Sequence, residues 1–247
     1  MPGGVLAVFA HPDDESLLAG GTLAACAAAG RRVAIVSMTR GERGPGGLSG
    51  LGEVREAELQ AAARALGGAA AECLDYPDGE LGGVDEDETA QTLARLLERN
   101  RPEAVISFSE EGLYWHPDHL AVSRLLAAAL ELVSPAPEWA YGATWPEGHA
   151  ARLVALMRAS GLETDLWGLE PEAFGAPEDS ITNSLDVRAF LPAKLAALQA
   201  YASQIGPGHL LSALPHDLAE EFLGREYFVR LRPQQSDRNW LAEALAG

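Results

Sequence analysis

The stretch from Val5 to Gly21, VLAVFAHPDDESLLAGG, decides the fold that the rest of this chain is expected to adopt. Its first six residues, Val5 to Ala10, form an uncharged apolar run, which predicts a fully buried strand. We expect the strand to stop at Pro12, because proline has no backbone N–H to donate to a sheet. Asp13 and Asp14 follow, and then a segment that is typical of a helix. A histidine and two carboxylates at a strand end suggest a metal site or an acid–base site.

Apolar runs and helical patterns alternate along the remainder of the chain. Further strands are predicted at 32–38, 71–76, 103–109, 139–145, 181–187 and 226–231. Helices are predicted at 16–29, 53–66, 85–100, from the segment after 119 to about 133, near 150–160, and at 189–204. Strands that alternate with helices indicate a parallel sheet covered on both faces. We therefore predict an α/β fold, a Rossmann-like doubly wound and mostly parallel sheet with helices on both faces.

Composition limits the classes of partner. The 247 residues carry 36 acidic and 18 basic side chains, a formal net charge of −18, so nucleic acid and anionic membranes would be repelled. Two cysteines do not indicate a disulfide framework. The N-terminus lacks a basic region and its apolar run is short, so we expect neither a signal peptide nor a membrane span, and a cytoplasmic location.

Two His-Pro-Asp segments follow the first and fourth predicted strands: HPDD at 11–14 and HPDH at 116–119. Chance predicts roughly 0.02 such triplets in a chain of this composition, so two of them suggest a shared role. In the common strand order 3-2-1-4-5 the first and fourth strands are neighbours, and ligands bind outside their carboxyl ends. The two segments are therefore expected to face each other across one crevice.

Each segment alone has an ordinary structural interpretation. Asp13 or Asp14 can cap a helix, and His116 or His119 can be a hydrogen-bonded loop residue. Together they offer two imidazoles and a carboxylate, the usual ligands of a catalytic zinc with an open fourth position. A second acid would take a proton from the metal-bound water, and a second histidine, held by Asp118, would act as an acid or electrostatic catalyst.

AHPDDE at 10–15 and HPDH at 116–119 resemble the PIG-L/LmbE-like family of zinc-dependent N-acetylglucosamine deacetylases, which includes enzymes of mycothiol and bacillithiol biosynthesis. The resemblance extends to TRGERG at 39–44, REAEL at 55–59, YPDGEL at 76–81 and KLAALQAYASQ at 194–204. It implies a metal-dependent amidohydrolase that removes an N-acetyl group from an amino-sugar conjugate, a small-molecule substrate. The cofactor is expected to be Zn²⁺, with Fe²⁺ as the alternative for a site of two histidines and one aspartate.

The resemblance also assigns roles to single residues. It implies zinc ligands at His11, Asp14 and His119. Asp13 would be the general base that deprotonates the metal-bound water. We expect the protein to be a single domain over residues 1–247, with a catalytic core at about 1–145 and the C-terminal part completing the pocket.

Two residues of the second segment, and a tyrosine two residues before it, complete the implied chemistry. His116 would be a protonated catalyst that stabilises the oxyanion or the leaving amine, with Asp118 behind it. Tyr114 would donate a hydrogen bond from its phenol to the oxyanion. The alternative is that Tyr114 is simply an aromatic residue that lines the loop.

The family pattern places sugar-hydroxyl contacts at Arg55 and Asp78. Their alternatives are a surface pair with a neighbouring glutamate for Arg55 and turn chemistry for Asp78. Glu15 is expected to be a structural acid of the first helical turn, and the Gly-rich loop 40–52 a mobile cover over the substrate. Tyr201 departs from the family, which usually has a histidine there, so a substrate contact from that position is in doubt.

Two rival functions remain at this point. In the first, the same metal site acts on a different small amide. The loops 40–52 and 146–180 would determine that substrate, and the sequence does not reveal which one they favour. A non-catalytic sugar- or nucleotide-binding protein of Rossmann type is the other, although no G-x-G-x-x-G follows the first strand. The sequence leaves the oligomeric state open, a homo-oligomer included.

Overall fold

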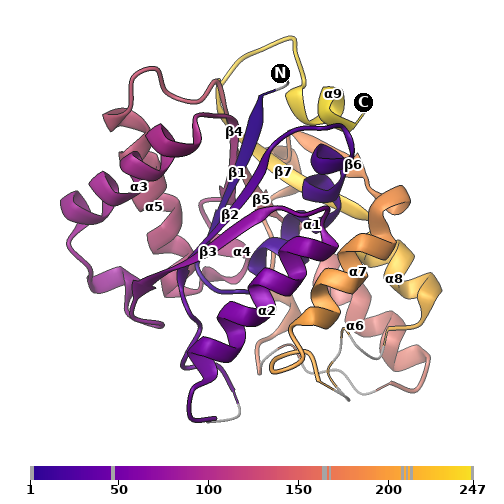
Figure 1. Cartoon of the computed structure of the whole chain (residues 1–247). Helices are drawn as coiled ribbons and strands as arrows, with labels where there is room; N and C mark the ends of the chain where they lie inside the picture. Colours follow the sequence, from indigo (N-terminus) through magenta and orange to yellow (C-terminus); the bar gives the residue numbers. More distant parts are fainter. Residues whose placement is uncertain are drawn as a thin grey trace.

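Seven strands form one sheet in the order β3-β2-β1-β4-β5-β7-β6 (Figure 1). The computed structural model describes residues 3–45, 48–162, 166, 168–206, 209, 211 and 214–245. The strands are β1 Gly4–Phe9, β2 Val33–Thr39, β3 Ala70–Tyr76, β4 Pro102–Phe108, β5 Trp139–Thr144, β6 Asn183–Asp186 and β7 Arg225–Arg232. The first five are parallel, and β7 runs antiparallel to both β5 and β6. The predicted mostly parallel, doubly wound sheet and its 3-2-1-4-5 order are confirmed.

Helices cover both faces of this sheet, as predicted. Figure 1 shows α1, α2 and α7 on one side of the sheet and α3 and α5 on the other. The helices are α1 Asp14–Ala28, α2 Leu51–Ala65, α3 Glu86–Asn100, α4 Gly112–Trp115, α5 Pro117–Leu132, α6 His149–Ala159, α7 Leu191–Ala200, α8 His216–Leu223 and α9 Trp240–Leu245. The sequence did not predict α8 and α9. None of the helices in the described ranges is long and apolar enough to cross a membrane.

The central position of β1 explains its uncharged sequence. It lies between β2 and β4, and all six of its residues are buried. Phe9 at its end packs edge-on against Phe108 at the end of β4, with ring centroids 4.9 Å apart. Because β1 and β4 are parallel neighbours, the two loops that follow them begin side by side.

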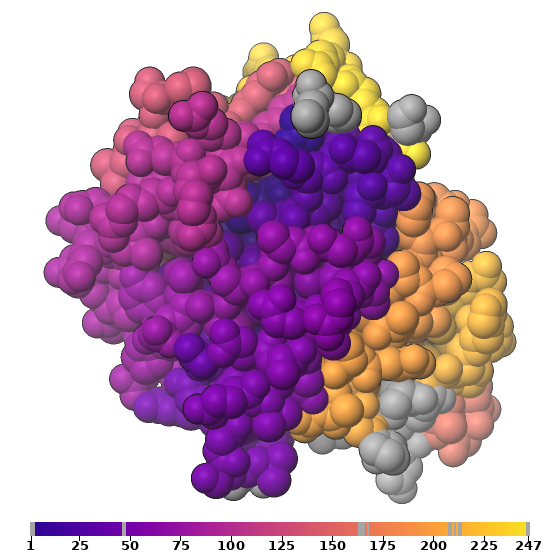
Figure 2. All heavy atoms as spheres, viewed as in Figure 1, coloured from indigo at the N-terminus to yellow at the C-terminus, as the bar shows by residue number. Residues whose placement is uncertain are grey.

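The first helix is packed on nearly all sides. Its residues from Asp14 to Cys26 are all buried. A Cβ at Gly21 would lie 2.6 Å from Val187, so only glycine fits where the segment before α7 crosses the helix. Figure 2 shows α7, in orange, lying directly against α2, in purple, on the surface of the molecule. The C-terminal segments therefore complete the packing around the first helix.

Candidate active site

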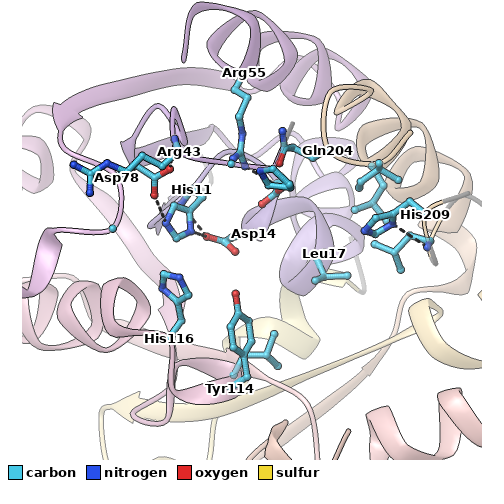
Figure 3. Close-up of a pocket in the computed structure, with 18 residues that line it drawn as sticks. His11, Asp14, Leu17, Arg43, Arg55, Asp78, Tyr114, His116, Gln204 and His209 are labelled. Carbon is cyan, nitrogen blue, oxygen red and sulfur yellow. Dashed lines mark hydrogen bonds and ion pairs between the residues drawn. The ribbon is translucent and has the colours of Figure 1, made fainter. Parts of the chain in front are cut away.

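The two His-Pro-Asp segments meet at the carboxyl ends of β1 and β4. His119 Nε2 lies 3.3 Å from His11 Nδ1, although 108 residues separate the two histidines in the chain. Asp14 completes the group: its Oδ2 lies 3.4 Å from His11 Nδ1 and its Oδ1 lies 3.5 Å from His119 Nε2. Figure 3 shows His11 and Asp14 at one end of a cavity.

These three side chains have the spacing of metal ligands. Bonds of 2.0–2.1 Å to a tetrahedral zinc place neighbouring ligand atoms about 3.4 Å apart. The 3.3 Å between the two ring nitrogens matches that value, and each nitrogen lies near one oxygen of Asp14, His11 Nδ1 at 3.4 Å from Oδ2 and His119 Nε2 at 3.5 Å from Oδ1. His11, Asp14 and His119 therefore form a site that can hold a metal ion.

The ring nitrogens that face away from this site are held by the protein. His119 Nδ1 donates to the carbonyl of Gly112 at 2.9 Å, and its ring stacks on Phe108 with centroids 3.9 Å apart. His11 Nε2 lies 3.1 Å from Asp78 Oδ1 and 3.3 Å from Asp118 Oδ2. Such contacts on the far nitrogen fix the ring orientation and tautomer of a metal-binding histidine.

Protonation of these groups follows from their surroundings. Burial lowers the pKa of His119 to about 4, which leaves the ring neutral and able to bind a metal. Burial opposes the charge of Asp14, but His119 and His11 outweigh it and lower the pKa of Asp14 to about 2. Burial also disfavours a charged His11, yet its hydrogen bonds to carboxylates raise its pKa well above the ordinary value.

The carboxylate of Asp118 does not support His116 as the sequence predicts, because it hydrogen-bonds elsewhere. It contacts His11 and accepts backbone N–H groups from Gly79 at 2.7 Å and Leu81 at 3.0 Å. His116 contacts Asp118 only through the backbone, because its Nδ1 accepts the Asp118 N–H at 3.2 Å. The reason is that Asp118 lies at the start of α5 with its side chain turned toward His11 and toward the segment after β3, where these two amides lie.

His116 differs from the expectation of a protonated catalyst. An imidazole nitrogen that accepts an N–H carries no proton, so Nδ1 is bare and the proton of the neutral ring is on Nε2. Burial and the neighbouring His11 also lower the pKa of His116. The ring still lies against His11, with centroids 5.1 Å apart, and it borders the cavity.

Asp13 has a strained backbone next to these groups. Its φ of 124° lies in a region that residues with a Cβ rarely adopt. Its Oδ2 accepts a hydrogen bond from Arg55 Nη2 at 3.0 Å. Burial raises the pKa of Asp13 to about 7, with Arg55 opposing and Asp14 adding to that change. The carboxyl is thus placed at the cavity with a pKa near neutrality.

Arg55 and Asp78, the two expected sugar-binding residues, both border the cavity and also contact Asp13 and His11 respectively. Arg55 is 4 % exposed, and its guanidinium donates to the carbonyls of Pro12 and Gly41 as well as to Asp13. Asp78 is 6 % exposed and accepts the backbone N–H of Arg43 at 2.8 Å while it contacts His11.

Tyr114 lies in an irregular turn that follows β4. Leu113 and Trp115 on either side of it have positive φ values of 69° and 62°. This backbone turns the Tyr114 side chain inward, and Figure 3 shows its hydroxyl pointing toward Asp14. Its ring lies 5.1 Å from that of His119 and 5.1 Å from that of Phe174.

The cavity itself has a volume of about 390 Å³. Several lining residues received no individual role from the sequence, among them Leu17, Arg43, Gln204 and His209. Arg43 lies in the predicted covering loop, so the loop does border the cavity, although 46–47 are outside the described residues. Tyr201 is fully buried and does not line the cavity, which removes the substrate contact held in doubt for that position.

Comparisons with known proteins agree with this arrangement. A sequence profile of the PIG-L family, described as GlcNAc-PI de-N-acetylase, matches residues 6–130. The chain is 34 % identical over 272 residues to the 1D-myo-inositol 2-acetamido-2-deoxy-alpha-D-glucopyranoside deacetylase of Thermomonospora curvata, with 92 % of this chain and 90 % of that protein covered.

Solved structures are similar over nearly the whole chain. A conserved protein from Thermus thermophilus is 31 % identical, with a TM-score of 0.62 over 95 % of this chain and 97 % of the other. The 4-carboxy-2-hydroxymuconate hydratase of Pseudomonas putida shares the fold at 22 % identity, with a TM-score of 0.66 over 96 % and 100 % of the two chains. The family match and the close relatives together show that this chain belongs to the PIG-L family.

Proposed function

We propose that this protein is a zinc-dependent deacetylase that hydrolyses the N-acetyl group of an N-acetylglucosamine conjugate. The observation that carries the proposal is the convergence of His11, Asp14 and His119, with contacts of 3.3–3.5 Å between their ring nitrogens and carboxylate oxygens, beside the strained Asp13. The curated relative at 34 % identity is named as a deacetylase of an inositol glycoside of this kind. The shared fold of a hydratase means that the chemistry has to be argued from these residues rather than from the fold.

The metal would be held by His11, Asp14 and His119, which leave a fourth position open. A bound Zn²⁺ polarises an amide carbonyl and lowers the pKa of water toward 7. Two histidines and one aspartate also suit Fe²⁺, which the metal analysis below includes.

The residues around the metal site would divide the work of hydrolysis. Asp13 takes the proton of the attacking water as its oxygen bonds to the carbonyl carbon. Tyr114 donates its hydroxyl to the carbonyl oxygen, on which negative charge develops. Asp13 then delivers the proton taken from water to the nitrogen as the C–N bond breaks, while His116 donates a hydrogen bond from Nε2 to the oxyanion or the leaving nitrogen. Acetic acid, which ionises to acetate, and the free amine result.

The remaining groups would orient these catalysts and the sugar. Asp118 and Asp78 hold the His11 ring through Nε2, and Arg55 holds the Asp13 carboxylate. Each oxygen of Asp78 accepts one contact and keeps a second lone pair, so this side chain can also accept a sugar hydroxyl. Arg55 lines the same cavity and would be the second contact to the sugar.

Metal analysis and an activity screen test this proposal. The purified protein, loaded with Zn²⁺ or Fe²⁺, would be incubated with the inositol and malate glycosides of N-acetylglucosamine and with unrelated acetamides, and amine release would be measured. We expect one metal ion per chain and amine release from a sugar conjugate. Activity on the unrelated amides alone would favour the rival substrate class, and a chain without stoichiometric metal would favour a binding protein.

A matched pair of histidine variants gives the control. His119→Ala should lose both the metal and the activity, because it removes one of three ligands. His216→Ala, at an exposed histidine that begins α8, should keep both. Full metal content and activity in His119→Ala would contradict the assignment.

A further inference from the structure

The first turn of α1 contains a buried carboxylate that has no part in the chemistry above. Glu15 is 1 % exposed, and none of the ion pairs among the described residues includes it. Its Oε2 accepts the backbone N–H of Asp13 at 3.2 Å. Its Oε1 accepts the hydroxyls of Ser16 at 2.5 Å and Tyr201 at 2.6 Å. Glu15 therefore links a core tyrosine to the backbone of Asp13.

The backbone of Asp13 needs such a contact. Its φ of 124° and ψ of −29° are unfavourable for a residue with a Cβ, and the surrounding structure has to hold them. The N–H of Asp13 precedes α1, where amides have no partner within the helix. Glu15 satisfies this N–H, while Arg55 holds the side chain at Oδ2. Asp13 is thus fixed at two points, one on its backbone and one on its carboxylate.

Tyr201 is itself held firmly in the core. It is fully buried at the end of α7. Two residues later, Ser203 donates from its N–H and its hydroxyl to Glu58 of α2 at 2.7 and 2.6 Å. At the other end of the same helix, Lys194 contacts Glu226 at 2.7 Å. With α7 anchored on both sides, the Tyr201 hydroxyl is a fixed donor for Glu15.

We propose that Tyr201 and Glu15 are positioning residues for deacetylation: the Tyr201 hydroxyl keeps the Glu15 carboxylate on the Asp13 N–H, and this contact fixes the direction of the Asp13 carboxylate. The inference rests on the proposed function, in which Asp13 is the general base. The three proposed metal ligands have other contacts: His11 is oriented by Asp118, His119 by Gly112, and Asp14 accepts the backbone N–H of His11 at 2.8 Å. Loss of the Tyr201 hydroxyl should therefore disturb the base and leave the metal in place.

Tyr201→Phe is the direct test, since it removes the hydroxyl and keeps the ring that fills the core. We expect kcat to fall roughly ten- to hundredfold, as a small displacement of a catalytic group does, while KM changes less than about twofold. The affinity for zinc, measured by competition with a chelator, should stay at the wild-type value. The control is Tyr141→Phe, an equally buried tyrosine of β5 whose ring packs against Trp139 and Phe228, and it should keep the wild-type kcat.

Glu15→Gln tests the same contact from its other partner. A glutamine oxygen can still accept the Asp13 N–H, and its amide N–H can donate to the Tyr201 oxygen, so this variant should retain more activity than Tyr201→Phe or Glu15→Ala. Glu15→Gln, compared with Glu15→Ala, also tests the inference if Tyr201→Phe does not fold.

The outcomes separate this inference from the proposed function. A wild-type kcat in Tyr201→Phe, or no difference between Glu15→Gln and Glu15→Ala, would overturn the positioning role while the wild-type protein remains an active deacetylase. A parallel loss of zinc affinity and kcat would also overturn it, because the contact would then support the metal site. A wild-type protein that releases no amine in the same assay would contradict the proposed function and this inference together.

Discussion

Two neighbouring aspartates acquire different chemistry from their contacts. Burial disfavours the charge of both. Asp14 faces His119 and His11, which lower its pKa to about 2, so it stays ionised as a ligand requires. For Asp13, burial is the largest effect and raises the pKa. Arg55 offsets part of this rise and the charge of Asp14 adds to it, so that the pKa of Asp13 is about 7. Adjacent acids whose pKa values are separated in this way are suited to different roles, here ligand and base.

Replacement of Asp13 by asparagine tests this division. Asp13→Asn keeps the shape of the side chain and its hydrogen bond from Arg55 but cannot accept a proton. We expect kcat to fall by about 10²–10⁴, the usual contribution of a general base, with zinc still bound. Steady-state kinetics and metal analysis check this. Asp75→Asn, at an exposed aspartate of β3, is the control and should leave kcat unchanged. A metal-free Asp13→Asn would instead make Asp13 a ligand.

Sequence could predict which residues converge, because position after a strand fixes the edge of the sheet at which a residue lies. It could not predict the direction of each side chain. Asp118 turns to His11 and to the amides of Gly79 and Leu81, which become its partners only once the segment after β3 has packed against α5. Arg55 likewise reaches Asp13 across the start of α1. These orientations depend on tertiary packing, and no local pattern encodes them.

At the scale of elements, a buried ion pair ties α7 and β7 to the first helix. Lys194, the only lysine of the chain, is 1 % exposed and contacts Glu226, which is 2 % exposed. Glu226 also accepts the N–H groups of Gly21 and Thr22 in α1 at 2.7 and 2.8 Å. A buried carboxylate with four donors links three elements at the middle of α1.

Lys194→Met should strongly destabilise the protein. It leaves the Glu226 charge buried without a cation, which typically costs about 3–5 kcal/mol of the free energy of unfolding. Lys194→Met combined with Glu226→Gln should recover much of this loss, since glutamine keeps an acceptor for α1 without the charge. Urea unfolding measures both. Arg152→Met, in an exposed pair with Glu221, should cost at most about 1 kcal/mol. Equal losses in the single and double variants would contradict this explanation.

The contact between α6 and α8 should be sensitive to acid through His149. Its Nε2 donates to the carbonyl of Phe222 at 3.3 Å, and burial lowers its pKa to about 4. In the unfolded chain the ordinary pKa is about 6.5. Between these two values the unfolded state binds a proton that the folded state does not, so stability falls as pH drops from 6.5 to 4 and then levels off.

His149→Gln isolates this contribution, because glutamine keeps a donor for Phe222 and does not titrate. The difference in free energy of unfolding between variant and wild type should shift in favour of the variant as pH falls from 6.5 to 4. Urea unfolding at several pH values gives this difference. Curves that stay parallel over the whole interval would show that His149 does not titrate on unfolding.

The sequence predicted helices and strands where the spacing of apolar residues is clear, and it missed helices that are short. The alternating strands and longer helices up to β5 were predicted because buried strands read as apolar runs, whereas the four-residue helix α4 falls in a segment predicted as a loop. Helices α8 and α9 have eight and six residues, too few turns for a reliable period. The segment after α7 supplies Gln204 and His209 to the cavity. Gln204 ends the KLAALQAYASQ segment but received no role from it, and His209 belongs to no motif, so their place at the cavity appears only in the fold.

At the scale of the whole molecule, the excess of acidic residues should weaken the folded state. A net charge of −18 repels itself more strongly in a compact protein than in an extended chain. Several exposed ion pairs offset part of this, but each contributes little in water. The stability of this protein should therefore depend on ionic strength more than that of a protein with balanced charge.

Salt titration at two pH values tests this. Raising NaCl from about 0.01 M to about 0.1 M shortens the Debye length from about 30 Å to about 10 Å, which screens repulsion between distant carboxylates. We expect the thermal midpoint at pH 7.5 to rise over this interval, and KCl to act equally, since screening does not depend on the cation. At pH 5, close to the sequence pI of about 4.6, the net charge is small and the same addition should have much less effect. A midpoint that stays constant at pH 7.5, or a salt effect of equal size at both pH values, would mean that net charge does not limit the stability of this fold.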